Sequence, residues 1–246
     1  MRALVVLPTL NEAGTIGRVV ELLLSVDGAL DLLVVDDASD DGTPEIIKDL
    51  RGGRVELIER SRRLGLGSAY LRGFDWALQR AYEAVVEMDA DLSHDPLDAV
   101  RLLAALKDAD VVIGSRYVPG GRVENWGLFR RALSLAGNRY AQVLLGIDVA
   151  DSTSGLRAYR TEWLGRAGLE TVASEGYAFQ VELAYRAVRS HANVVEIPIA
   201  FTERVAGRSK MSRAIVLEAL FRIAGWALRD RVLAPLRRRL DRRQDR

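Results

Sequence analysis

The sequence predicts an α/β fold with a mostly parallel central sheet and helices on both of its faces. In the first half of the chain, short runs of Val, Ile and Leu alternate with stretches of helical length. The apolar runs are nearly continuous, as expected for strands that are buried on both faces. An alternating order of strands and helices is typical of parallel sheets, whose strands are joined by crossover helices.

Five apolar runs are the expected strands of the first half. They lie at Ala3–Leu7, Leu32–Val35, Val55–Ile58, Ala84–Met88 and Val111–Ile113. Between them, helices are expected at 19–26, 44–50 and 68–83. Thr43 stands where an N-cap is expected, and Pro44 occupies the first helical position, where its missing N–H costs nothing.

The second half is less regular, and no shift in composition marks a second domain. We expect a mobile loop at 118–127, a helix at 128–145, a loop at 151–160 that returns to a strand, and a helix at 176–190. Residues 192–201 read as a strand, with Pro198 at an edge or a bulge because proline cannot donate to a ladder. A basic loop follows at 201–210, and about the last 30 residues are expected to be helical.

Composition excludes several classes of protein. Of the 246 residues, 49% are hydrophobic, which fits a globular chain with a substantial core and not a disordered one. There is no cysteine, so disulfides and thiolate zinc sites are excluded, and a reducing compartment is allowed. The first twelve residues carry only a short apolar run and no cleavage pattern, so a signal peptide is not expected.

The segments that follow the strands test function, because ligands of such sheets bind at the carboxyl ends of the strands. The first reads PTLNE and lacks G-x-G-x-x-G, which disfavours a nicotinamide cofactor, and no G-K-[ST] of a P-loop occurs. The second reads DDASDDGT, and the fourth reads DADLSHD. Two strand ends therefore deliver carboxylates to one edge of the sheet.

Asp89 and Asp91 form the more informative acidic pair. Side chains alternate along an extended segment, so both point the same way. Two carboxylates at this spacing suit Mg²⁺ or Mn²⁺, which adds water and phosphate oxygens. Alternatively Asp89 caps the next helix and Asp91 is solvated, but Ser93 and Asp95 are better placed as caps. Zinc is not expected, since His94 has no second His or Cys nearby.

Asp36 and Asp37 directly follow the second strand. An acidic side chain there can accept hydrogen bonds from a nucleobase or a ribose, as the acidic residue of dinucleotide folds does. The alternative is turn chemistry, for which residues 40–42 have the typical composition. We expect one of the two aspartates to bind ligand and the other to support the loop.

Cationic side chains are available for phosphate. Arg116 ends the fifth strand, Arg130 and Arg131 open a helix, and the loop at 201–210 contains Arg204, Arg208 and Lys210. Each alone would be expected to be solvated, but together they lie where an acidic, metal-binding sheet edge needs phosphate partners. A divalent metal, acidic base-binding residues and several cations describe a site for a nucleoside-diphosphate donor and an anionic acceptor.

Eight motifs carry a resemblance to a known family over about residues 3–225. They are LPTLNE, VVDDASDDGT, RLGLGSAYLRGF, MDADLSHDP, GSRYVPGG, DSTSGLRAYR, GYAFQVEL and EIPIAFTERVAGRSKMS. With them the chain resembles family 2 glycosyltransferases of GT-A fold, and among these the dolichyl- and polyprenyl-phosphate β-D-mannosyltransferases, or polyprenol monophosphomannose synthases. We therefore expect a GT-A catalytic domain over 1–210, followed by an amphipathic helix and arginine-rich tail over 211–246.

The resemblance implies the residues of a donor site. Pro8, Leu10 and Glu12 would hold the base or the ribose, Leu10 through its backbone, and Val35 and Asp37 would add to this part of the site.

The donor diphosphate would lie along Asp89, Ala90 and Asp91, with Asp91 on the metal and Asp89 supporting or joining it. Ser93 falls where some relatives have a metal-binding Gln, and the shorter Ser would act on the metal through water.

The family pattern also implies roles for the cations. Arg204 and Lys210 would contact the donor diphosphate, Arg116 would contact donor or acceptor phosphate, and Arg130 would contact the acceptor phosphate.

The implied reaction is inverting transfer of mannose from GDP-mannose to a polyprenyl (dolichyl-type) phosphate, with Asp89, Asp91 and Arg116 as the catalytic residues. The metal and the cations would stabilise the departing GDP. The acceptor phosphate has a second pKa of about 6, so a dedicated general base is not required, although Asp89 could serve. The alternatives are a UDP-glucose:polyprenyl-phosphate glucosyltransferase, another family 2 transferase, and a non-catalytic nucleotide-sugar binding module.

A lipid acceptor requires contact with a membrane surface. The longest late apolar stretch, 214–228, has 15 residues and is interrupted by Glu218 and Arg222, short of the about 20 that span a bilayer. With Arg229 these two residues share one helix face, which leaves an apolar side that includes Phe221 and Trp226. That side either packs on the domain or lies in the membrane interface.

The end of the chain is basic, with eight Arg and three Asp from Arg229 to Arg246. This favours an anionic membrane surface, and nucleic acid is not expected because aromatic interleaving and recognised motifs are missing. We expect a cytoplasmic protein, peripheral on the inner face of the membrane. An integral membrane partner subunit is the alternative anchor.

Overall fold

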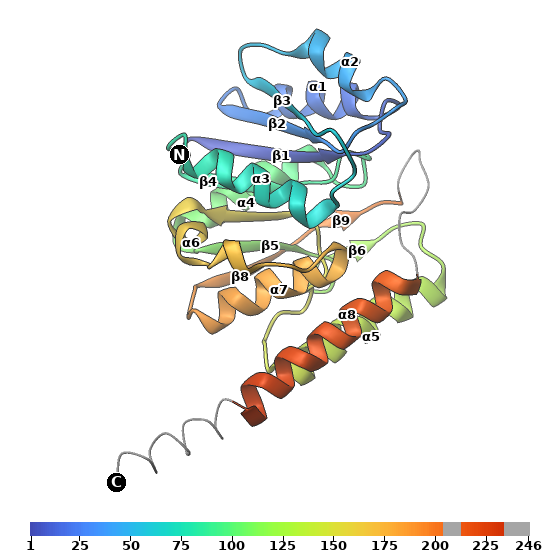
Figure 1. The fold of residues 1–246 in the computed structure, drawn as a ribbon, viewed down its shortest axis with the longest axis vertical. Coiled ribbons are helices and arrows are strands. Elements are labelled where there is room, and N and C mark those ends of the chain that lie inside the picture. Colours follow the sequence, from blue (N-terminus) through green and yellow to red (C-terminus); the bar gives the residue numbers. More distant parts are fainter. Residues whose placement is uncertain (204–212, 234–246) are drawn as a thin grey trace.

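A computed structural model of the chain describes residues 1–203 and 213–233. A seven-stranded sheet has the order β3-β2-β1-β4-β7-β5-β8 (Figure 1). Its strands are β1 Ala3–Thr9, β2 Leu30–Asp36, β3 Val55–Glu59, β4 Ala84–Glu87, β5 Val111–Ser115, β7 Arg157–Arg160 and β8 Val194–Pro198. Only β7 runs antiparallel to its neighbours among these described strands. The predicted fold class is confirmed.

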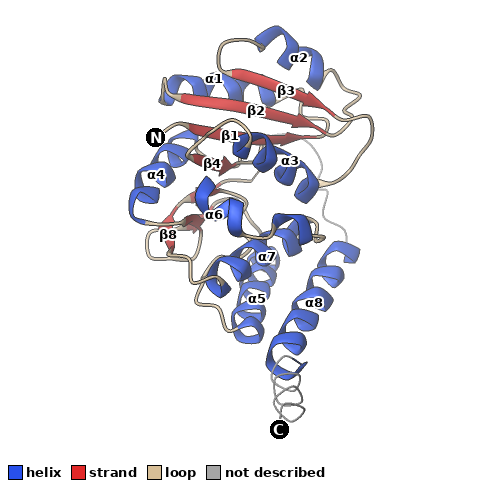
Figure 2. Cartoon of the chain, turned by 60° about the vertical axis from the view of Figure 1, so that its left-hand side comes forward, coloured by secondary structure: helices blue, strands red, loops and turns tan. Residues whose placement is uncertain are grey.

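Helices cover both faces of the sheet (Figure 2). One face packs against α1 Ile16–Val26, α2 Thr43–Leu50 and α4 Pro96–Ala105, and the other against α3 Leu66–Leu78, α6 Thr161–Arg166 and α7 Gly176–Arg189. Strand β1 shows why its sequence does not alternate: Val5 packs among the first group and Val6 among the second. Both are completely buried. Short helical turns at η1 Leu106–Asp108 and η2 Leu169–Thr171 complete the loops.

Two further helices, α5 Leu128–Leu145 and α8 Arg213–Leu228, lie side by side beyond the sheet (Figure 1). They run in the same direction, because the Tyr140 hydroxyl donates to the Leu220 carbonyl and the Arg231 guanidinium to the Val143 carbonyl. Helix α8 continues into a π-helical turn, η3 Arg229–Leu233, and also packs on α7. Within the described ranges, no helix has both the length and the apolar character needed to cross a membrane.

Helix α8 divides its surface into three stripes. Ala219, Ile223 and Ala227 are buried against the neighbouring helices, and Glu218 and Arg222 form an ion pair on a polar edge. A third, exposed apolar stripe consists of Leu217, Phe221 and Leu228. The predicted apolar side is therefore split. Trp226, predicted to lie on it, stacks on Tyr185 of α7 instead.

Most predicted elements are present, and the differences have local causes. The helix predicted at 128–145 has the predicted bounds, whereas the loop prediction at 118–127 is wrong at β6 Arg122–Val123. A two-residue strand is too short to produce a periodic pattern. It pairs with β9 Ala200–Phe201, because the single strand predicted at 192–201 breaks after Pro198 and its end turns to a second sheet. Pro198 ends an edge strand, as predicted.

The helix beginnings differ in detail from the predictions. Helix α2 starts at Thr43, and its N-cap position is taken by Gly42, whose φ of 93° few other residues would tolerate. Thr43 does not act as the predicted cap, because its hydroxyl donates to Asp41 and accepts from the Glu12 amide. Helix α3 starts two residues earlier than predicted. It ends at Leu78, so Tyr82, which was predicted to be helical, lies beyond its end.

Gly73 allows α3 to lie directly on β1. A Cβ at this position would be 2.5 Å from Val6 Cγ1 and 2.7 Å from Val6 Cγ2. We expect Gly73→Ala to lower the free energy of unfolding by about 1–2 kcal/mol, because overpacking costs about 1–3 kcal/mol and helix propensity returns up to about 1 kcal/mol. Urea denaturation measures the difference.

Gly137→Ala in α5 is the matched control, since a Cβ there meets nothing within 4 Å. It should keep or raise the stability. Equal losses in the two variants would contradict the direct packing of α3 on β1.

Candidate active site

A pocket of about 460 Å³ opens at the carboxyl edge of the parallel strands. Its walls come from the ends of β1, β2 and β4, the segment before α3, the start of α7 and the segment that leads into α5. The predicted site residues that line it are Pro8, Leu10, Glu12, Asp37, Asp89, Ala90, Asp91, Arg116 and Arg130. Residues that the sequence places far apart are therefore brought together around one cavity.

Four predicted site residues are not among the lining residues. The Val35 side chain packs in the hydrophobic core, so only its backbone could serve a ligand. Ser93 is 1% exposed, and its hydroxyl has no hydrogen-bond partner in the described part of the chain. Its role at a metal stays a prediction. Arg204 and Lys210, like Arg208, lie outside the described residues.

In the acidic segment after β4, the residue that begins the next helix is Asp95 and not Asp89. Asp95 caps α4 by accepting a hydrogen bond from the Leu97 amide at 2.9 Å, as predicted for one of its two candidates. Ser93, the other candidate, does not cap; its own amide donates to Asp91 at 3.1 Å. Asp89 and Asp91 both line the pocket.

Buried neighbours hold the Asp89 carboxylate from behind. The Tyr70 hydroxyl donates to Oδ1 at 3.4 Å, and His94 Nε2 lies 3.6 Å from Oδ2. Burial raises the pKa of Tyr70 well above its usual value, so the phenol remains a neutral donor. His94 had no role in the sequence prediction, yet it is 3% exposed and packs edge-on against Phe201.

The donor set fits a divalent cation. Asp89 and Asp91 offer hard carboxylate oxygens, which Mg²⁺ and Mn²⁺ prefer, and a protein pair of this kind leaves positions for phosphate and water. Gly155 keeps space beside the pair, because a Cβ there would be 3.3 Å from Asp89 Oδ2. Among the residues that the structure describes, no group of three or more His, Cys, Asp or Glu is placed to hold a metal.

The two aspartates at the end of β2, Asp36 and Asp37, make different contacts. Asp36 is 1% exposed and accepts hydrogen bonds from Thr9 and Ser39, so it supports the loop. Asp37 lines the pocket and accepts from the amides of Leu64 and Gly65, both at 2.8 Å. Asp37 therefore shapes the pocket wall. One of these two aspartates was predicted to bind ligand, and Asp37 is the one that lines the pocket.

A second carboxylate orders the same wall. Glu175 accepts hydrogen bonds from the amides of Gly67 and Ser68 at the start of α3. Gly65 adopts a φ of +96°, and a Cβ there would be 2.5 Å from a Glu175 oxygen, so only glycine fits. Burial raises the pKa of Glu175 above its usual value. The G-x-G within RLGLGS is a sequence feature from which this close approach could have been predicted.

Arg116 is held by a carboxylate that the sequence analysis did not identify. Its Nε and Nη2 donate to the two oxygens of Asp151 at 2.7 and 2.6 Å, and Nη2 also donates to Thr153. Burial alone would raise the pKa of Asp151, but the charge and hydrogen bonds of Arg116 outweigh it and lower that pKa. The buried pair is therefore ionised on both sides and close to neutral overall.

Aromatic rings form the wall next to the two arginines. The Arg130 guanidinium lies 4.0 Å from the centre of the Trp126 ring and pairs with Glu203 at 2.9 Å. Trp126 in turn packs edge-on against Phe201, with ring centres 5.4 Å apart. Stacking on the indole orients a cation that would otherwise be a solvated side chain.

The family model for glycosyl transferase family 2 matches residues 4–168. The chain belongs to this family. Two relatives cover nearly all of the glycosyltransferase. A polyprenol monophosphomannose synthase of Mycolicibacterium smegmatis is 46% identical over 94% of this chain and 89% of its own length. An undecaprenyl-phosphate mannosyltransferase of Micrococcus luteus is 44% identical over 94% and 96%.

A solved structure supports the GT-A architecture of the glycosyltransferase. It is a mannosyltransferase from Pyrobaculum calidifontis in complex with GDP-Man and Mn²⁺, with a TM-score of 0.56 and 20% identity. The likeness covers 92% of this chain and 72% of that protein. At this identity it establishes the common fold alone.

A buried carboxyl group and a buried guanidinium lie close to the candidate active site of the glycosyltransferase. Glu87 at the end of β4 and Arg157 on β7 are both 0% exposed and face each other across paired strands. Arg157 donates to the carbonyls of Ser152, Ser154 and Gln180. Burial raises the pKa of Glu87 from 4.5 to about 7, although the charge of Arg157 opposes the rise.

This raised pKa makes stability depend on pH. The folded state holds the proton of Glu87 more tightly than the unfolded chain, so the stabilisation is complete below the unfolded pKa and is lost as pH rises through about 7. We expect the stability of the wild-type protein to fall between about pH 5 and 7 by up to about 1.4 kcal/mol per unit from this group. Glu87→Gln cannot ionise and should lose this component.

Urea denaturation of both proteins across this range isolates the effect, because other titrating groups contribute equally to both. Parallel pH profiles for the wild type and Glu87→Gln would contradict the raised pKa.

Proposed function

We propose that this glycosyltransferase transfers mannose from GDP-mannose to a polyprenyl (dolichyl-type) phosphate, with inversion at the anomeric carbon. The observation that carries the proposal is one pocket in which the acidic pair Asp89 and Asp91 meets Arg116 and Arg130. An acidic pair suits a metal-bound diphosphate, and arginines suit phosphate oxygens. The names of two relatives, 46% and 44% identical, support both the sugar and the lipid phosphate.

The donor would enter with its nucleoside at the β1–β2 side of the pocket. We assign Pro8, Leu10 and Glu12 to the base and ribose, together with Asp37, whose amide donates to the Thr9 carbonyl at 2.9 Å. Because Asp37 is held by two backbone amides and by Arg60 at 2.9 Å, its position is set before ligand arrives. A preorganised acceptor of this kind reduces the ordering cost of binding.

The diphosphate would lie over Asp89, Ala90 and Asp91, with Mg²⁺ or Mn²⁺ held by Asp91 and by Asp89. When bound, such a cation supplies compensation for the charge that develops on the departing GDP. The Mn²⁺ in the mannosyltransferase from Pyrobaculum calidifontis supports a divalent ion in this fold. The Tyr70 hydroxyl and the His94 ring contact the two Asp89 oxygens and so restrict the orientation of this carboxylate in the pocket.

The acceptor phosphate would bind at the arginine end, where the two cations differ in availability. Arg116 has Nε and Nη2 committed to Asp151, a buried pair that is costly to separate. Arg130 is paired with Glu203 in a half-exposed contact, 35% and 48% exposed, which is worth at most about 1 kcal/mol. Arg130 can therefore exchange Glu203 for phosphate, while Arg116 adds its remaining Nη1.

The chemistry needs no dedicated base at this end. A phosphate monoester is largely dianionic near neutral pH, so its oxygen can attack the anomeric carbon while the bond to GDP breaks on the opposite side. That single displacement inverts the configuration. The protein contributes by orienting the two anions against each other and by offsetting their charges.

The first test is transfer of labelled sugar to a short polyprenyl phosphate in detergent, with GDP-mannose and UDP-glucose in parallel. We expect mannose in the lipid phase with Mg²⁺ or Mn²⁺ and none after EDTA. Labelled glucose alone in the lipid phase would replace the donor assignment and keep the acceptor.

Asp91→Asn is the matched variant of this assay, and it should abolish transfer with either metal. Asp95→Asn is the control, because Asp95 lies four residues away and only caps α4, and Asn caps nearly as well. Near-normal transfer by Asp91→Asn would exclude Asp91 as the metal ligand.

We further propose peripheral contact with the inner, cytoplasmic face of a membrane through α5 and α8, an assignment that rests on the lipid acceptor. The helix pair exposes a group of large apolar side chains, and such groups are rare on the surfaces of soluble monomeric proteins. The exposed fractions are 85% for Leu128, 82% for Phe129, 75% for Phe221 and 56% for Leu228.

Flotation with lipid vesicles tests this contact. We expect Phe129→Ser with Phe221→Ser to reduce vesicle binding by about a hundredfold or more, because each burial of an aromatic side chain contributes about 1.5–3 kcal/mol and about 1.4 kcal/mol is a factor of ten. Transfer to the short acceptor in detergent should be retained.

The control pair is Leu78→Ser with Leu97→Ser, exposed leucines on α3 and α4. If the wild type does not bind vesicles, the anchor would be an integral membrane partner subunit.

A further inference from the structure

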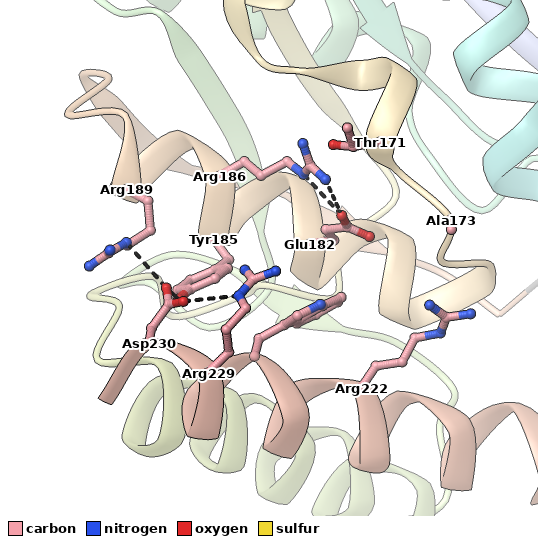
Figure 3. A pocket seen from close by; sticks show the side chains of 10 residues that line it. Thr171, Ala173, Glu182, Tyr185, Arg186, Arg189, Arg222, Arg229 and Asp230 are labelled. Carbon is pink, nitrogen blue, oxygen red and sulfur yellow. Dashed lines mark hydrogen bonds and ion pairs between the residues drawn. The ribbon is translucent and has the colours of Figure 1, made fainter. Parts of the chain in front are cut away.

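A second cavity, of about 990 Å³, lies between α7, the loop before it and α8 (Figure 3). Four arginines and two carboxylates are in its lining: Arg186, Arg189, Arg222, Arg229, Glu182 and Asp230. We call it the arginine pocket. The lining charges leave an excess of two positive charges, which favours an anionic occupant.

The arginine pocket is separate from the candidate active site. The two cavities share no lining residue. Both use α7, but at 3.6 residues per turn Tyr177 and Gln180 lie on a different face of this helix from Tyr185 and Arg189. An occupant of the arginine pocket would therefore contact neither the sugar donor nor the acceptor phosphate.

One of the four arginines is structural. Arg186 donates from Nε and Nη2 to Glu182 and from Nη1 to the carbonyls of Ala167 and Gly168. Glu182 also accepts from the Ser174 hydroxyl. This saturated group forms part of the wall and keeps the loop before α7 against the helix.

The other three arginines are only partly engaged. Arg189 and Arg229 share the single carboxylate of Asp230, through Nε atoms at 3.5 and 3.1 Å, and Asp230 also accepts from the Tyr185 hydroxyl. Arg222 contacts Glu218 through Nε at 2.8 Å. Within the described residues, the Nη1 and Nη2 atoms of these three side chains make no hydrogen bond. They form the kind of multiple donor set that binds phosphate oxygens.

An apolar stripe next to these donors narrows the class of anion. On α8 the exposed residues Leu217, Phe221 and Leu228 follow one side of the helix, and Arg222 and Arg229 form the adjoining edge. Trp226 stacks on Tyr185 in the cavity wall, with ring centres 6.3 Å apart. Cations and amphipathic aromatic rings beside an apolar stripe are typical of protein surfaces at the headgroup level of a membrane.

We propose that the arginine pocket binds the phosphodiester headgroup of an anionic phospholipid, whose acyl chains lie along Leu217, Phe221 and Leu228. A free phosphate would use the arginines but leave the apolar stripe without a function. A zwitterionic lipid would bring its own cation toward the arginines. The inference goes beyond sugar transfer, because this phospholipid is neither donor nor acceptor.

The probe is dihexanoyl phosphatidylglycerol below its critical micelle concentration, titrated calorimetrically into the full chain. We expect saturable binding at one site, with dihexanoyl phosphatidylcholine and inorganic phosphate each at least about tenfold weaker, since the first lacks net charge and the second lacks apolar contact. Phosphate that binds as tightly as the lipid would overturn the lipid assignment. Failure of phosphatidylglycerol to bind would overturn the proposal as a whole.

Matched charge variants locate the site. Arg189→Gln with Arg229→Gln should weaken phosphatidylglycerol binding by about tenfold or more, because charge-assisted hydrogen bonds are lost. Arg18→Gln with Arg51→Gln removes the same charge from surface ion pairs on the first face of the sheet, at similar exposure, and should leave binding unchanged. Equal losses in both pairs would indicate attraction to net charge alone and would overturn the site.

A variant that is expected to bind the lipid more tightly excludes misfolding as the cause of lost binding. Asp230→Asn removes the carboxylate that Arg189 and Arg229 share, and should tighten binding; weaker binding would contradict the proposal. Transfer of mannose to a short acceptor in detergent should be unchanged in Arg189→Gln with Arg229→Gln. Failure of the lipid site and failure of the proposed transferase function therefore give different results.

Discussion

Burial of the central strands on both faces is the constraint on which the rest of this structure depends. Val5 and Val6 are both completely buried although they point to opposite sides of β1. A strand in that setting cannot carry polar side chains along its length, because an unpaired polar group would be desolvated. Polar chemistry is therefore confined to the strand ends. Asp37 and Asp91 follow two such ends, and the parallel order of β2, β1 and β4 gathers them at one edge.

The carboxylates gathered at that edge repel one another, so their negative charges must be offset. The structure offsets charge locally: Arg60 pairs with Asp37 at 2.9 Å, and amides at the start of α3 donate to Glu175. A divalent cation held by Asp89 and Asp91 would offset their charges, which is consistent with the proposed metal and with a donor that brings phosphate.

Sequence reasoning succeeded where the signal is local and failed where partners are distant. The pattern of acidic residues after the predicted strands indicated Asp89 and Asp91. The turn-forming residues at 40–42 indicated the loop after β2. Asp151 could not be found in this way, since its pairing with Arg116 joins positions 35 residues apart. His94 has no second His or Cys nearby in the sequence, so no metal role is predicted for it. Its contact with Asp89 arises from the fold of one short loop.

On the proposed function, the helix pair α5 and α8 places the membrane-contacting surface next to the site of the reaction. Arg130 lies in the first turn of α5 and lines the active-site pocket, and directly before it Leu128 and Phe129 are more than four-fifths exposed. A phosphate at Arg130 is thus within a few residues of an apolar surface. A polyprenyl phosphate could keep its chain among membrane lipids while its headgroup reaches the donor. The transferase would then need to move only the charged headgroup of its substrate away from the bilayer. The headgroup contributes least to the affinity of the substrate for the bilayer.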